Sequence, residues 1–85
     1  MAASKSDIRF WIDNRANRGY ANATHMLVFC DTFDYDDYPV YVTPDEDVRK
    51  VIAEKDGKNM QQLMECYNLG ENIEEQLLSN RVMNL

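Results

Sequence analysis

Residues 24–42 read THMLVFCDTFDYDDYPVYV, and this stretch decides the fold. Its first part, His25 to Cys30, is too short for a typical helix and is rich in residues that favour β-strands. Its last part, Tyr38 to Val42, has a similar composition, and the polar residues between the two predict a turn. The sequence therefore predicts an antiparallel β-hairpin over about residues 24–43.

Both faces of this hairpin carry apolar side chains. Alternation along the first strand places Met26 and Val28 on one face and Leu27 and Phe29 on the other. Neither face is typical of a surface in water, so we expect other elements to cover both. Pro39 has no amide hydrogen to donate, which predicts either that the second strand lies at an edge of the sheet or that its first turn is irregular.

The flanking segments show helical patterns. A capping arrangement at Ser4 and apolar residues at helical spacing up to Gly19 predict a helix over residues 5–18. Thr43-Pro44-Asp45-Glu46 combines an N-cap, a proline at the first helical position and a capping-box glutamate, which predicts a helix over residues 44–56. Apolar spacing predicts two further helices, over residues 59–68 and 71–82.

The expected fold is thus α+β, a single small acidic domain over residues 1–85 with the element order α-β-β-α-α-α. A two-stranded hairpin alone is marginal in water, and the pattern offers no convincing third strand. We therefore expect a homodimer in which hairpin edges pair or apolar faces pack together.

The composition narrows the setting. The start of the chain lacks a long apolar stretch, and the longest apolar run, residues 26–30, is far too short to span a bilayer, so we expect a cytoplasmic protein without membrane contact. Cys30 and Cys66 are isolated within apolar patterns, which predicts buried thiols in a reducing compartment rather than a disulfide or a metal site.

Charge is the most distinctive feature of the sequence. The formal net charge is −6, and residues 31–47 hold seven acids and no Lys or Arg. Because phosphate binding needs a basic patch, this distribution argues against nucleic acid as a direct partner. The same distribution favours a partner protein with a basic surface.

Several interpretations of the acidic turn compete. An EF-hand calcium loop needs a glycine at its sixth position, and counting from Asp31 or Asp34 gives Asp36 or Pro39 there, so we expect no metal. Acid and base catalysis by paired carboxylates would need a pocket that no pattern identifies. Each aspartate alone is explained by a solvated turn in which it accepts backbone hydrogen bonds.

Together with the interleaved aromatic residues, the same carboxylates are typical of a recognition surface that needs no cofactor. The candidate binding residues are Asp31, Phe33, Asp34, Tyr35, Asp36, Asp37, Tyr38 and Tyr41.

Two other functions remain open. Aromatic side chains such as Tyr35, Tyr38 and Tyr41 could stack on a nucleotide-derived ligand at a dimer seam. A phosphorylated ligand would then need a base from the first helix, namely Arg9, Arg15 or Arg18. An enzyme using His25, Cys30 and Asp31 is the hypothesis that the residues support least, because neighbouring carboxylates disfavour a thiolate.

A resemblance supplies context. The segments Ala23-Thr24-His25-Met26, residues 30–34 and residues 37–42 resemble a group of small hypothetical proteins encoded by bacteriophages and prophages. The similarity continues at the segments 59–61, 64–67 and 76–77. It carries no activity, but it implies a protein made inside a bacterial cell. Binding that inhibits or modulates a host factor, including a defence component, is therefore the leading hypothesis.

Overall fold

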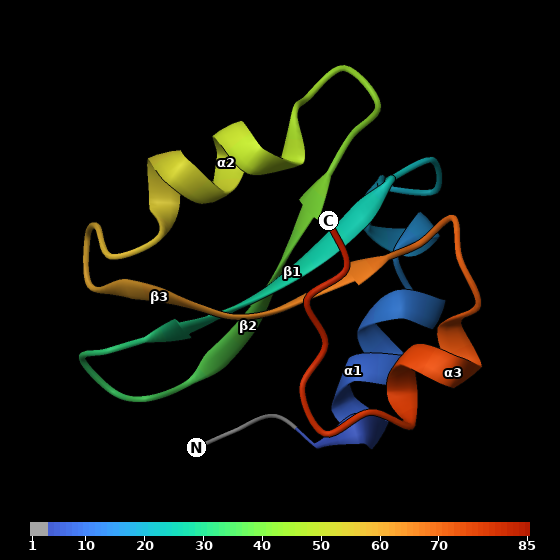
Figure 1. Ribbon diagram of the computed structural model, residues 1–85, viewed down its shortest axis with the longest axis horizontal. Helices are drawn as coiled ribbons and strands as arrows, with labels where there is room; N and C mark the ends of the chain where they lie inside the picture. The colour runs from blue at the N-terminus through green and yellow to red at the C-terminus, as the bar shows by residue number, and fades with distance from the viewer. Residues whose placement is uncertain (1–3) are drawn as a thin grey trace.

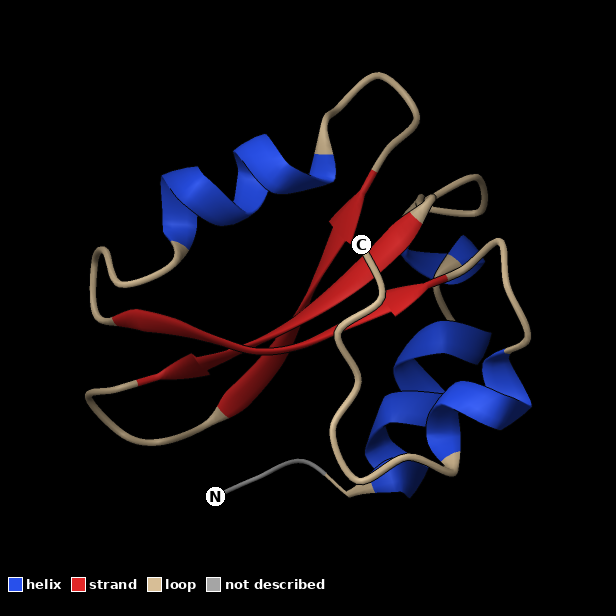
Figure 2. Cartoon of the chain, viewed as in Figure 1, coloured by secondary structure: helices blue, strands red, loops and turns tan. Residues whose placement is uncertain are grey.

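A computed structural model describes residues 4–85 as a three-stranded antiparallel sheet with helices on both of its faces (Figures 1 and 2). The strand order is β2-β1-β3, so β1 is the central strand. The elements in chain order are α1 (Lys5–Asp13), the 3-10 turn η1 (Ala16–Arg18), β1 (His25–Asp31), β2 (Asp37–Val42), α2 (Val48–Lys55), β3 (Gln61–Asn68) and α3 (Ile73–Leu77).

The hairpin forms as predicted. β1 and β2 pair antiparallel without irregularity, from His25 opposite Val42 to Cys30 opposite Asp37. The Asp31 amide donates to the Asp36 carbonyl at 2.8 Å, so the backbone of Asp36 faces β1. In an antiparallel pair, successive residues of a strand direct their backbone N–H and C=O groups alternately toward the neighbouring strand and away from it. Pro39, three residues further on, therefore directs its backbone away from β1, and its position on an edge strand is confirmed.

The predicted helix over residues 59–68 and the two-stranded sheet are wrong, because β3 occupies residues 61–68 and pairs with the free side of β1. The order of the elements is α-β-β-α-β-α rather than α-β-β-α-α-α. Val28 lies opposite Glu65 and Phe29 opposite Leu63, so Met64 is the extra residue of a β-bulge.

The bulge explains the error. It shifts the alternation of β3, so that Leu63 and Cys66 belong to one apolar cluster whereas Met64 and Tyr67 belong to the other. A strand interrupted in this way repeats its apolar residues at intervals of three, which is also a helical interval. Local spacing therefore could not separate the two structures.

Helices cover both faces of the sheet, which confirms that expectation. One face packs against α1 and α3, and the other packs against α2 (Figure 1). The buried residues of the first face are Ile8, Ile12, Ala23, Met26, Val28, Tyr41, Tyr67 and Val82. Those of the second face are Leu27, Phe29, Val42, Val51, Leu63 and Cys66.

The helices are shorter than predicted. The capping box at Ser4 is present, but α1 ends at Asp13, and a separate 3-10 turn leads to Gly19, whose φ of 84° is left-handed. The Glu46 carboxylate accepts from the Thr43 amide, which is one half of the predicted capping box, but the Glu46 amide donates to the Thr43 carbonyl rather than to its hydroxyl, and the two residues form an isolated turn. The helix itself starts at Val48, because the Asp47 side chain accepts from the Arg49 amide instead.

The predicted helix over residues 71–82 is confined to α3, and the chain then runs back along the outer edge of β3. There the Cys66 amide donates to the Val82 carbonyl at 2.8 Å, and the Asn84 amide donates to the Cys66 carbonyl at 2.9 Å. β3 thus has a partner on each side along part of its length, whereas β2 is the exposed edge.

We expected a dimer because a two-stranded hairpin alone would be marginally stable. The structure has a third strand, so this argument for a dimer no longer holds. Dimerisation itself stays a prediction. Within residues 4–85, no helix is both long enough and apolar enough to cross a bilayer.

Candidate binding surface

The turn between β1 and β2 is built by its own aspartates. The Asp31 carboxylate accepts from the Phe33 amide at 2.8 Å, and the Asp34 carboxylate accepts from the Asp36 amide at 3.1 Å. The Tyr35 amide donates to the Asp31 carbonyl at 2.7 Å. These are the local hydrogen bonds by which aspartate stabilises a turn, so Asp31 and Asp34 have a structural role.

The acids that follow the hairpin also serve local structure. Thr43 donates through its hydroxyl to Asp45 and through its amide to Glu46, and Asp47 caps α2. The hydrogen bond from Thr43 lowers the pKa of Asp45. Most of the acidic run is therefore explained by turns and caps, although its negative charge remains on the surface.

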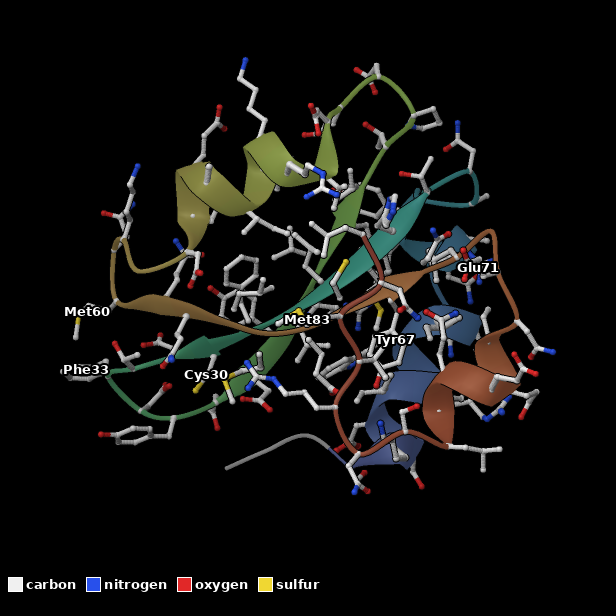
Figure 3. The ribbon with its side chains drawn as sticks, in the orientation of Figure 1. Cys30, Phe33, Met60, Tyr67, Glu71 and Met83 are labelled. Atoms are coloured by element: carbon white, nitrogen blue, oxygen red, sulfur yellow. The ribbon has the colours of Figure 1, made fainter. Side chains whose placement is uncertain are left out.

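What turns and caps do not explain is a group of large apolar side chains at this end of the sheet. Phe33 is 76% exposed, Tyr35 64% and Met60 54%, and we call these three residues the apolar tip. Phe33 and Met60 lie at the same end of the molecule, opposite the end that holds Glu71 (Figure 3). The Thr32 amide donates to the Met60 carbonyl at 2.8 Å, which ties the two loops together.

The backbone of the tip is held in an unusual conformation. Tyr35, Asn59 and Met60 have φ angles of 61°, 50° and 60°, and they are the only non-glycine residues among residues 4–85 with positive φ. Each such residue costs roughly 1 kcal/mol, which its surroundings must offset. Hydrogen bonds from Gly57 to Gln61 and from Gln61 to Lys58 complete the second loop. The tip therefore presents its side chains on a constrained backbone.

Sequence reasoning missed Met60, because it placed this residue inside a helix. The turn-forming segment Gly57-Lys58-Asn59 just before it was the available signal. Its position beside Phe33 depends on β3 pairing with β1, which no local pattern showed.

Three of the predicted site residues lie elsewhere, and one of them, Asp37, lines a cleft on the face of the sheet that packs against α1. Tyr38 packs toward α2, where its ring lies 6.3 Å from that of Phe29 and its hydroxyl donates to the Gln61 side chain at 2.6 Å. Tyr41 is buried on the opposite face, where it stacks on Tyr20 at 4.8 Å. Because Tyr38 and Tyr41 lie on opposite faces of the sheet, Tyr35, Tyr38 and Tyr41 cannot all stack on one ligand.

The residues of the enzyme hypothesis are not brought together. His25 and Cys30 lie five positions apart on β1, roughly 16 Å along an extended strand, and face opposite sides of the sheet. The His25 Nδ1 atom lies 2.9 Å from the Thr24 hydroxyl oxygen. Burial lowers the pKa of His25, so the ring is neutral at neutral pH.

Both cysteines are buried and unpaired, as the sequence predicts. Burial and the neighbouring Asp37 raise the pKa of the Cys30 thiol. Burial raises the pKa of Cys66 to about 11. Neither cysteine therefore has the lowered pKa of a reactive thiol.

The remaining candidates for a functional site are a hollow beside α2 and any cluster of metal-binding side chains. A hollow of about 340 Å³ beside α2 is lined by four acidic side chains, one basic side chain and one valine: Asp45, Glu46, Asp47, Glu54, Lys50 and Val51. No set of three His, Cys, Asp or Glu side chains within residues 4–85 has the geometry of a metal site. The exposed tip is thus the best candidate for a functional surface.

Comparison of the chain with protein-family models, with curated proteins and with solved structures finds no significant match.

Proposed function

We propose that this protein is a non-catalytic binding protein that docks the apolar tip into an apolar pocket with a basic rim on a partner protein. In the bacterial setting that the phage resemblance implies, the partner is a host factor, and docking inhibits or modulates it. A component of host defence is one such factor.

The observation that carries this proposal is the exposure of Phe33, Tyr35 and Met60 at one end of the sheet. Aromatic residues and methionine are enriched in the buried centres of protein interfaces, where a few side chains supply most of the affinity. A constrained backbone lowers the entropy lost on binding, so the positive φ angles at Tyr35 and Met60 fit the same role.

The acidic residues beside the tip predict that the partner surface is basic. Asp34 and Asp36 are exposed beside the tip, and the hydrogen bond that Asp34 accepts leaves its negative charge in place. Such a field speeds the approach of a basic surface and disfavours an acidic one. It also opposes nucleic acid, whose phosphates would be repelled.

Affinity capture from a bacterial lysate tests the proposal with a matched pair of variants. The tip variant combines Phe33→Ser with Met60→Ser. The control variant combines Phe10→Ser with Leu78→Ser, which removes two exposed apolar side chains, 53% and 86% exposed, on α1 and at the end of α3. Melting curves establish that both variants are folded.

The wild-type protein and the control variant should retain the same partner, and the tip variant should lose it. Because truncating a central anchor costs about 2 kcal/mol or more, the partner's affinity for the tip variant should fall at least about thirtyfold. Equal retention of that partner by both variants would exclude the tip as the docking surface. For the electrostatic part, Asp36→Asn should slow association at low salt and have little effect at high salt.

A further inference from the structure

One end of the sheet carries a cleft on the face that packs against α1. The cleft has a volume of about 340 Å³, and its lining residues are Lys5, Asp37, Gln62, Met64, Glu65, Asn80 and Arg81. Helices α1 and α3 pack under the opposite end of this face, which leaves the hairpin end without a helix among the described residues (Figure 1). A volume of this order suits a small ligand.

The register of the sheet defines the floor of the cleft. Cys30 of β1 lies between Asp37 of β2 and Gln62 of β3, and these three residues form one row across the sheet. Met64 follows Gln62 on the same face and is half-buried. The floor therefore combines the Met64 thioether, the Gln62 amide and the Asp37 carboxylate.

Lys5 and Arg81 both line the cleft, and their side chains have different partners. The Lys5 ammonium lies 3.7 Å from the Glu65 carboxylate and donates to the Tyr67 hydroxyl at 3.1 Å. The ion pairs within residues 4–85 are Lys5–Glu65 and Arg9–Glu74, so Arg81 belongs to neither. Arg81 is held instead through Nε, which donates to the Met64 carbonyl at 3.3 Å.

The Glu65 carboxylate already has hydrogen-bond partners within the protein. One of its carboxylate oxygens accepts from the Val82 amide at 3.1 Å, and the other accepts from the Tyr67 hydroxyl at 3.3 Å. Turning this carboxylate toward Arg81 would break both hydrogen bonds. The guanidinium therefore keeps its capacity for an anion, next to the apolar surface of Met64.

We propose that this cleft binds a small organic carboxylate of about amino-acid size. The carboxylate pairs with the free edge of the Arg81 guanidinium, which can donate two parallel hydrogen bonds, and the aliphatic part of the ligand covers Met64. Lys5 pairs with Glu65, and Asp37 also lines the cleft, so the formal charges of the cleft balance and the preference for a carboxylate depends on Arg81. This site is separate from the docking function, because none of the residues that line it belongs to the apolar tip.

Isovalerate, a branched monocarboxylate, is a suitable probe, and isovaleramide is its neutral counterpart of nearly the same shape. Titration followed by amide resonances in NMR, at constant ionic strength, should show saturable shifts at Gln62, Met64 and Arg81 with isovalerate. An affinity on the order of millimolar is expected for so small a ligand. Isovaleramide should give no saturable shifts at these residues.

The substitution Arg81→Gln should weaken isovalerate binding about two- to fivefold, which is the range for one solvent-exposed ion pair. Arg49→Gln is the matched control, since Arg49 is exposed on α2 at the other face of the sheet, and this variant should bind as the wild type does. The proposal is overturned if isovalerate gives no saturable shifts, if isovaleramide binds equally well, or if Arg81→Gln leaves the affinity unchanged.

Discussion

The assignment of Asp31 to the structure of the turn can be tested by comparing Asp31→Ala with Asp31→Asn. The Asp31 carboxylate accepts from the Phe33 amide at 2.8 Å. Alanine removes the acceptor, whereas asparagine keeps a carbonyl oxygen of the same reach and removes only the charge. Loss of a side-chain acceptor of this kind costs about 1 kcal/mol, and its replacement by asparagine costs at most a few tenths of that.

The two variants should therefore differ in thermal stability. For a domain of this size, 1 kcal/mol corresponds to a shift of about 4–8 °C in Tm, so Asp31→Ala should melt lower by about that amount. Asp31→Asn should melt close to the wild type. Asp36→Ala is the control within the same turn, because Asp36 is exposed and its carboxylate accepts none of the turn hydrogen bonds described above.

Calorimetry or circular dichroism melts at neutral pH measure all three variants. The structural role of Asp31 would be refuted if alanine and asparagine lowered Tm equally, since the charge rather than the hydrogen bond would then be responsible. It would also be refuted if Asp36→Ala were as destabilising as Asp31→Ala.

Three further predictions concern other parts of the fold. The pKa of His25 is lowered from 6.5 in the folded state, so stability should be unaffected above that pH, fall as the pH drops below it and level off below the folded pKa. His25→Gln should reduce the loss of stability between about pH 7.5 and 5.5, and an unchanged pH profile would contradict the assignment. Pro39→Val should add an outward amide to the β2 edge and raise the average mass in light scattering at high concentration; a mass equal to that of the wild type would show that Pro39 does not limit pairing. Cys66, fully buried with a pKa of about 11, should react with a thiol reagent more slowly than Cys30, which is 9% exposed, and mass spectrometry that found equal rates would count against this order.

The candidate site was only partly predictable. Phe33 and Tyr35 follow from the hairpin, since a turn between two buried strands must project its central side chains into solvent. Tyr38 and Tyr41 do not belong with them, because they lie on β2 itself, three positions apart, and alternation places them on opposite faces of the sheet. The acidic run was interpreted as a recognition surface, but Asp31, Asp34 and Asp47 are held by backbone amides.

The sequence by itself determined the features that depend on neighbouring residues: the hairpin over β1 and β2, the capping box at Ser4 and the edge position of Pro39. Only the tertiary structure decided that residues 61–68 form a strand, because an apolar interval of three suits both a helix and a bulged strand. Pairing with the second side of β1 satisfies the backbone of β3 and buries Leu63 and Tyr67 on opposite faces, which a solvent-exposed helix could not do. The position of Met60 beside Phe33 and the cleft at Arg81 both depend on that pairing.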